Sequence, residues 1–232
     1  MRYGLVTTAI ESTWPIDKSK PTLFLGEWCK LYNRRHIWSS LNVTVAHYHW
    51  DDRKKLYDDY LYLQKIYESQ LIKLSYKLNS IHGVDHSIRY WRILIGPWLG
   101  TFIQIVFDRW FMLEQVIESS KVKECKVIDR GGKSIIPYDM NDFSKLYLKD
   151  EWNEALYAEL IDRCWNKKIC VEKVDYEGDT IHENKGIYLK LNLVKKLKDI
   201  LYKILFSFNK LVQNDSGFFF LFSYLPLKTD LL

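Results

Sequence analysis

Short apolar runs and longer periodic stretches alternate along the chain. Runs of four to eight apolar residues, bounded by polar turn residues, are typical of buried strands. They predict strands at residues 3–10, 22–25, 43–46 and 125–128. The segment around 33–37, between the second and third of these strands, is basic and predicted to be helical.

Two long helices are predicted between the third and fourth strands. Leucine and tyrosine recur every three or four residues from Leu56 to Leu78, which places them on one face of a helix over about 52–82. Asp51 or Asp52 is a natural N-cap for it.

The second long helix is expected over about 87–118, with a bend at Pro97, because proline removes one helical hydrogen bond. Its uncharged stretch, 93–107, is shorter than the roughly 20 apolar residues that cross a bilayer. A buried helix is therefore expected there rather than a membrane span.

The alternation continues toward the C-terminus, with a helix, a polar loop, a second helix and an apolar strand. These elements are predicted at 150–166, 172–186, 189–212 and 218–225. Strands that alternate with helices usually form a parallel sheet covered on both faces. We therefore predict a single α/β domain over residues 1–232, Rossmann-like, with a mainly parallel sheet and helices on both faces.

Polar residues follow the first three predicted strands. In open parallel sheets, ligands bind beyond the carboxyl ends of the strands. This rule selects residues in three short segments as candidate ligand contacts: Thr8, Trp28, His49 and Trp50.

Two carboxylates in these segments are candidate general bases. Glu27 follows the second strand and Asp51 follows the third. A carboxylate at such a position can accept a proton from a substrate. For Glu27 an alternative is equally open, namely that its carboxylate caps a helix or pairs with Arg34 or Arg35.

The segment HYHWDD (47–52) also resembles the first ligand block of metallo-β-lactamase-type hydrolases. Such zinc sites need further histidine ligands downstream, and the three later histidines, His82, His86 and His182, have unsuitable spacings. The last position of the block, normally histidine, is Asp52. We assign no metal site, and a metal-dependent hydrolase remains only an alternative.

Three arginines flank the apolar part of the second long helix. Arg89 and Arg92 are three residues apart on one helix face and could hold a phosphate or carboxylate in their guanidinium forks. The alternative is ion pairing with Asp85, Asp108 or Glu114, and for Arg109 the ion pair is the preferred interpretation.

Composition narrows the function classes. The net charge of +5 is mild, and no concentrated basic stripe or zinc finger is present, so no nucleic-acid partner is expected. Neither a P-loop nor a dinucleotide-binding glycine motif occurs, so no cofactor is assigned to this chain. The four cysteines lack zinc or redox spacing, which favours a reduced, cytoplasmic location.

Several segments, taken in order, resemble a family of transferases encoded in bacterial O-antigen and surface-polysaccharide gene clusters. The resemblance rests on LVTTAIESTWP (5–15), LFLGEWCKLY (23–32), YHWDDRKKLYDDY (48–60), LNSIHGVDHSIRYWRILIGPWL (78–99) and FDRWFMLEQ (107–115). Weaker markers are DEWNEALYAEL (150–160) and FFFLFSYLPL (218–227).

The resemblance implies a glycosyltransferase-like enzyme with two facing Rossmann-like halves. This chain would be the N-terminal, acceptor-side half, and a nucleotide-activated donor would bind a C-terminal domain outside it. Glu27 or Asp51 would deprotonate a hydroxyl of a glycan or lipid-linked acceptor, with Trp28 and Trp50 stacked on sugar rings. Arg89 and Arg92 would hold an anionic sugar or a lipid-linked phosphate.

One alternative from another class stays open. The domain could be a non-catalytic module that docks on a glycan, a protein partner or a membrane. With either interpretation, the cytoplasmic location leaves room for peripheral association with the inner membrane.

Overall fold

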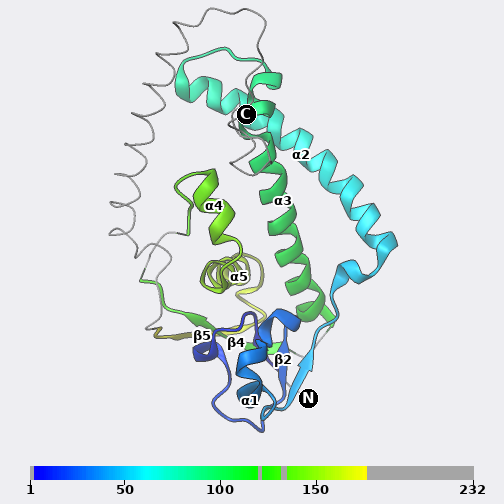
Figure 1. The fold of residues 1–232 in the computed structure, drawn as a ribbon, viewed down its shortest axis with the longest axis vertical. Coiled ribbons are helices and arrows are strands. Elements are labelled where there is room, and N and C mark those ends of the chain that lie inside the picture. The colour runs from blue at the N-terminus through cyan, green and yellow to red at the C-terminus, as the bar shows by residue number, and fades with distance from the viewer. Residues whose placement is uncertain (1–2, 120–121, 132–134, 177–232) are drawn as a thin grey trace, which may run out of the picture. The chain divides into compact units, whose positions relative to one another are not determined.

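A computed structural model of the chain describes residues 3–119, 122–131 and 135–176, all within the first of two compact units, Met1–Ile181. Its centre is a five-stranded, fully parallel sheet in the order β3-β2-β1-β4-β5 (Figure 1). The strands are β1 (Tyr3–Val6), β2 (Thr22–Phe24), β3 (Val43–Val45), β4 (Val122–Ile128) and β5 (Cys170–Val174). The predicted helix at 189–212 and strand at 218–225 lie outside the described residues.

Along each central strand, successive side chains point alternately into two hydrophobic cores, one on each face of the sheet. Leu5 and Leu23 pack on one face of the sheet, and Val6 and Phe24 pack on the other. This is the period of two expected for a strand buried on both sides. The predicted α/β, Rossmann-like fold with a parallel sheet is confirmed.

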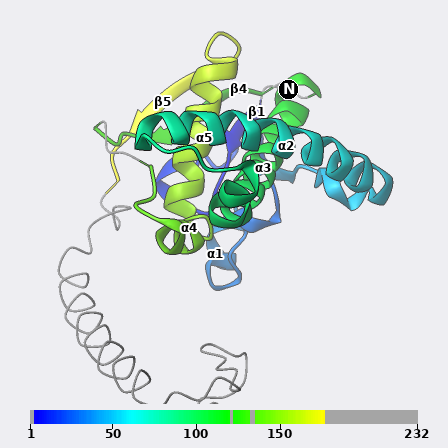
Figure 2. The ribbon, with the colours of Figure 1, turned by 90° about the horizontal axis from the view of Figure 1, so that it is seen from above.

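The two faces are covered by different elements. The long helix α3 (Ile88–Ser119) and helix α5 (Asp150–Trp165) cover the face of Leu5, and Figure 2 shows them side by side. The other face is covered by short elements, the 3₁₀ turns η1 (Glu11–Thr13) and η2 (Glu27–Cys29) and helix α1 (Arg35–Trp38). The 3₁₀ turn η3 (Tyr32–Arg34) leads into α1.

The strand order explains this division. From β1 the chain moves to β2 and β3 on one side, then returns to place β4 and β5 on the other side. Because crossovers between parallel strands are right-handed, a reversal of direction puts the later connections on the opposite face. Because the strands are parallel, the carboxyl ends of β1, β2 and β3 lie at one edge of the sheet.

Helices α2 (Arg53–His82) and α3 form a hairpin that extends away from the sheet (Figure 1). Asp52 is the N-cap of α2, where its carboxylate accepts hydrogen bonds from the backbone N–H groups of Lys54 and Lys55. A 3₁₀ turn, η4 (His49–Asp51), connects β3 to this cap. Helix α3 continues through Pro97.

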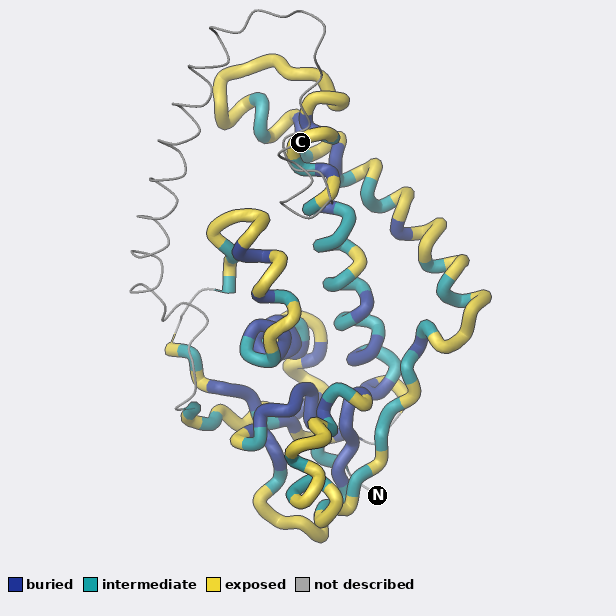
Figure 3. The backbone as a smooth tube through the Cα atoms, in the orientation of Figure 1, coloured by how far each residue is buried: buried dark blue, intermediate teal, exposed yellow. Residues whose placement is uncertain are grey.

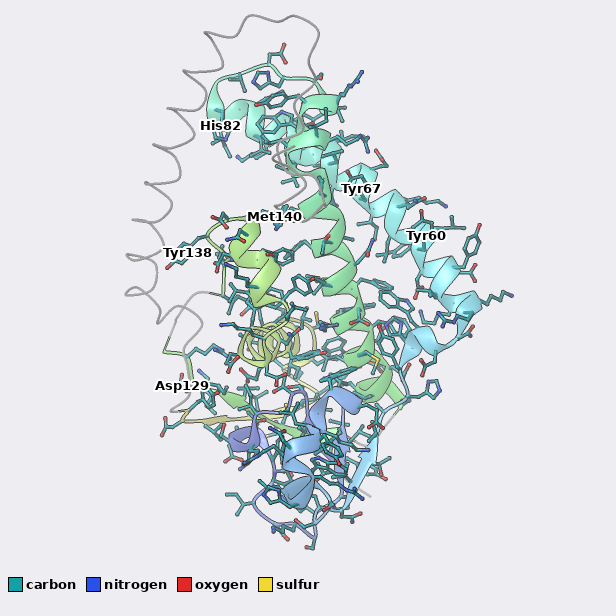
Figure 4. The ribbon with its side chains drawn as sticks, in the orientation of Figure 1. Tyr60, Tyr67, His82, Asp129, Tyr138 and Met140 are labelled. Atoms are coloured by element: carbon teal, nitrogen blue, oxygen red, sulfur yellow. The ribbon has the colours of Figure 1, made fainter. Side chains whose placement is uncertain are left out.

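Close packing of α2 on α3 depends on a small residue. The hydroxyl of Tyr67 would lie 2.6 Å from a Cβ atom at Gly96, so glycine makes room for it. Figure 4 shows Tyr60 and Tyr67 on α2. In the tube coloured by burial (Figure 3), the sheet and the adjoining helix surfaces are the most buried part, and much of the hairpin is exposed.

Two elements differ from the sequence prediction. Strand β5 covers part of a stretch predicted as loop. Its side chains are mostly exposed at the edge of the sheet, and the charged pair Glu172 and Lys173 interrupts its apolar residues. Helix α4 (Met140–Leu146) was not predicted; it begins after Asp139, whose carboxylate accepts the backbone N–H of Asp142. In the part of the chain described, no helix has the length and apolar character needed to cross a membrane.

Candidate active site at the carboxyl edge of the sheet

A cavity of about 590 Å³ lies at the carboxyl ends of β2 and β3. Its walls come from the segments that follow the two strands and from the middle of α3. The lining residues are Gly26, Glu27, Trp28, Val45, Ala46, His47, Tyr48, Asp51, Asp108 and Arg109. The cavity thus brings together three of the candidates selected from the sequence, Glu27, Trp28 and Asp51.

The two candidate bases are accessible from solvent. The side chain of Glu27 is 75% exposed and lies 3.2 Å from Nζ of Lys30, rather than pairing with Arg34 or Arg35. The side chain of Asp51 is 64% exposed, and its Oδ2 lies 3.9 Å from Nε2 of His47. Both carboxylates can therefore reach a molecule in the cavity without a change in the core.

The indole of Trp28 is held in place on the cavity wall. Its Nε1 donates a 2.9 Å hydrogen bond to the backbone carbonyl of Thr7, at the end of β1. The ring of Tyr48 meets it edge-on, with centroids 6.4 Å apart. Because its only polar atom is already bonded to Thr7, the indole offers the cavity a fixed apolar face, which suits stacking against a sugar ring.

A buried ionic group forms the inner side of the cavity. Nε2 of His49 lies 3.0 Å from Oδ1 of Asp108, and Nη1 of Arg109 contacts Oδ2 of the same carboxylate. Nε of Arg109 donates a 3.0 Å hydrogen bond to the side-chain carbonyl of Asn153 on α5. Asp108 is thereby satisfied from both sides, as a buried charge requires.

The pKa values follow from this arrangement. Burial alone would raise the pKa of Asp108, but the hydrogen bond from His49, the charge of Arg109 and the hydrogen bond from Tyr48 outweigh it, so the pKa is lowered. Burial, together with the charge of Asp108, raises the pKa of Tyr48. Tyr48 therefore stays protonated and donates its hydrogen bond to Asp108, so it is not a base at neutral pH.

His49 lies between Asp108 and a second carboxylate. Its fully buried ring stacks on Phe111 with centroids 4.8 Å apart, and Nδ1 lies 3.8 Å from Oδ2 of Asp59. That distance is too long for a hydrogen bond, and Asp59 instead accepts hydrogen bonds from Nε1 of Trp50 and from Nζ of Lys55. His49 thus reaches the cavity only through Asp108, which makes it a residue that positions the carboxylate.

Over residues 3–232, the sequence matches the family described as LIC12162 family transferase. The chain belongs to this family. Among curated proteins and solved structures, none matches it. Membership of the LIC12162 family places the chain in a transferase family.

The remaining candidates of this transferase lie elsewhere. Thr8 is buried beneath the sheet edge, and its hydroxyl has no hydrogen-bond partner. Trp50 faces a second cavity of about 610 Å³ between α2 and α3. Among the described residues that line it, most are apolar, and the charged one, Arg92, is paired with Glu68.

Arg89 and Arg92, in the first turns of α3, are remote from the first cavity. Arg92 donates two 2.6 Å hydrogen bonds to the carboxylate of Glu68 on α2, a partner that the sequence did not indicate. Arg89 is exposed in the first turn of α3. At 1.5 Å of rise per residue, Arg92 is about 25 Å along α3 from Asp108. The structure does not bring either arginine to Glu27 or Asp51.

Arg109 forms the predicted ion pair, with Asp108, but that pair also lines the cavity. From the sequence alone, Asp108 and Arg109 were not placed at the candidate site. The available signal was a charged dipeptide inside the aromatic run FDRWF (107–111), where an unpaired charge would be costly.

A second charged cluster follows β4, near Asp129 (Figure 4). Glu154 of α5 accepts the backbone N–H of Ile128 at 2.8 Å and pairs with Arg130. Burial still raises the pKa of Glu154 despite this pair. The cluster joins β4 to α5, and its carboxylate is too buried to meet a substrate.

Among the residues that the structure describes, no group of three or more His, Cys, Asp or Glu side chains is arranged to hold a metal ion. The histidines of the HYHWDD segment point to different partners. His49 contacts Asp108, and His47 faces Asp51.

Proposed function

We propose that this transferase moves a glycosyl group onto a hydroxyl of a glycan or lipid-linked acceptor in bacterial surface-polysaccharide synthesis. The acceptor would bind in the cavity beside Glu27 and Asp51. One observation carries the proposal: two exposed carboxylates and a fixed indole face the same cavity at the carboxyl edge of a parallel sheet. Ligands of this class of sheet bind at that edge.

The chemistry needs a base on the acceptor side. Glu27 or Asp51 would take the proton of the acceptor hydroxyl as its oxygen forms a bond to the donor's anomeric carbon. The bond from that carbon to the leaving group breaks, and the leaving group takes the electron pair. The activated donor would be bound by residues outside the described part of the chain.

The other cavity residues would position the acceptor. Trp28 offers a flat apolar face for a sugar ring, with its indole fixed by Thr7. Arg109 offers a partly exposed cation, with its orientation set by Asp108 and Asn153. Because Asp108 is ionised and fully paired, it holds Arg109 and Tyr48 in place and does not act as the base.

The proposal can be tested by complementation in the source bacterium. In a strain that lacks its own copy of the protein, Glu27→Gln and Asp51→Asn variants are expressed and the surface polysaccharide is analysed by gel electrophoresis. At least one variant should fail to restore the wild-type polysaccharide. Matched controls on exposed helix positions, Asp58→Asn and Glu159→Gln, should restore it.

Restoration of wild-type polysaccharide by both cavity variants would refute the assigned base. Thermal unfolding of each purified variant shows whether a failed complementation reflects chemistry or folding. If the domain is instead a non-catalytic glycan-binding module, both carboxylate variants would complement and a Trp28→Ala variant would not.

A further inference from the structure

The end of the α2–α3 hairpin carries a large exposed apolar surface. We define the hairpin tip as residues 71–95, which cover the last turns of α2, the connection at Gly83 and the first turns of α3. Tyr76 is 68% exposed, Ile81 63%, Ile93 72% and Leu94 60%. His82 marks the position of the tip in Figure 4.

Helix α3 is apolar on both sides within the tip. Trp91 is buried against α2, with its Nε1 bonded to Asn79. On the outer side, Tyr90, Ile93 and Leu94 have the spacing of a single helix face, and all are exposed. Only the side of Trp91 is covered, so the apolar outer side is available to a partner.

The hairpin tip is also basic. Residues 71–95 contain four cationic side chains and one carboxylate, Asp85. Lys73, Lys77 and Arg89 are exposed, whereas Arg92 is paired with Glu68. Cations beside exposed aliphatic and aromatic side chains are the pattern of segments that lie in the interface of an anionic bilayer.

The tip is held in a defined conformation. The side-chain amide of Asn79 donates to the backbone carbonyl of His86 at 2.9 Å and accepts the His86 N–H at 3.2 Å. Trp91 donates to the same Asn79 oxygen at 2.7 Å. The apolar residues are therefore presented without an ordering step on binding, which favours docking.

We propose that the hairpin tip docks on the surface of an anionic lipid bilayer. Ile81, Ile93 and Leu94 enter the boundary between headgroups and acyl chains, and Lys73, Lys77 and Arg89 contact lipid phosphates. The two clusters lie on one tip and act together. This inference does not depend on the proposed function, because docking requires no substrate and no turnover.

A second copy of the chain fits this surface less well. In a two-fold dimer the same patch meets itself, so the lysines of one tip would face the lysines of the other. Charged residues are also depleted from the centre of protein interfaces. The charge of the tip thus favours an acidic lipid surface.

The test is co-sedimentation of the full chain with vesicles of phosphatidylcholine, alone or mixed with phosphatidylglycerol. The wild-type protein should sediment with the mixed vesicles and stay in solution with the neutral ones. A Lys73→Glu/Lys77→Glu variant should bind the mixed vesicles at least about tenfold more weakly. An Ile93→Asp/Leu94→Asp variant should lose affinity to a similar extent.

Matched controls carry the same changes at exposed positions outside the tip. The Lys145→Glu/Lys167→Glu variant controls for charge and Leu148→Asp for an exposed apolar side chain, and both variants should bind like the wild type. Equal binding to neutral and anionic vesicles, binding to neither, or equal losses in the controls would overturn the proposal. So would a wild-type dimer that Ile93→Asp/Leu94→Asp converts to monomer without an effect on lipid binding.

Discussion

At the scale of single residues, Asp108 is the group on which the candidate site depends. It is buried, and His49, Arg109 and Tyr48 all direct hydrogen bonds or charge at it. Removal of one member of a buried ion pair leaves the other uncompensated. We therefore expect Asp108→Asn to lower the free energy of unfolding by about 3 kcal/mol, measured by urea denaturation at pH 7.

The pH dependence of that loss has a definite sign. The pKa of Asp108 is lower in the folded protein than in the unfolded chain, so its contribution to stability is present above the unfolded pKa. It disappears as the pH falls through the folded pKa. The stability difference between the two proteins should therefore be full at pH 7 and shrink below about pH 4.

The exposed Asp51 provides the control for Asp108. Asp51→Asn should change stability by no more than about 0.5 kcal/mol, because its side chain has no buried partner to lose. An equal loss of stability in both variants, or a loss that persists at low pH, would contradict the role given to Asp108.

Some site residues could be identified from the sequence and others could not. Glu27, Trp28 and Asp51 lie two to five residues after the ends of predicted strands, and a parallel sheet brings such positions to one edge. Asp108 and Arg109 lie more than 50 residues later on a helix, and only the packing of α3 against the sheet brings them to the cavity. No local sequence pattern predicts which turn of that helix packs beside the carboxyl ends of the strands.

At the scale of elements, the junction between β2 and η2 controls the shape of the cavity. Gly26 occupies this junction, and a Cβ atom there would overlap the six-membered ring of Trp28. Gly26→Ala should force the indole away from the cavity wall and lower the free energy of unfolding by about 2 kcal/mol, as overpacking does. Chemical denaturation followed by circular dichroism measures this loss.

A glycine on the neighbouring strand serves as the matched control. At Gly4 the nearest atom to an added Cβ is Oε1 of Glu124, at an ordinary contact distance of 3.5 Å. Gly4→Ala should be neutral or stabilising by about 0.5 kcal/mol, because alanine loses less backbone freedom on folding. If Gly26→Ala proved as stable as Gly4→Ala, the close approach of Trp28 to this turn would be disproved.

The elements with a clear hydrophobic pattern in the sequence were predicted, and those without one were missed. Helix α2 was predicted to within a residue, because its leucine period and the Asp52 cap agree. Strand β5 was missed, since a strand exposed at the sheet edge has no apolar alternation to detect. Helix α4 was missed because seven residues are too few for a clear helical period.

At the scale of the whole molecule, the candidate site and the hairpin tip lie far apart along α3. The sheet edge carries the polar cavity with its two exposed carboxylates, and the hairpin extends from the sheet to a basic, apolar tip. Along α3, about 30 Å separates Asp108 from the first residue of the helix, at 1.5 Å per residue. Variants at one site can therefore be tested without disturbing the other.

The central claim is that a carboxylate of the sheet-edge cavity acts as the base in group transfer. Its most direct test is the initial rate of glycosyl transfer to isolated surface-polysaccharide acceptor by the purified full-length protein, compared among the wild type, Glu27→Gln, Asp51→Asn and the control Glu159→Gln. Loss of a general base should slow transfer by a factor of about 10² to 10⁴ in one cavity variant, while Glu159→Gln keeps the wild-type rate. Wild-type rates in both cavity variants would contradict the account.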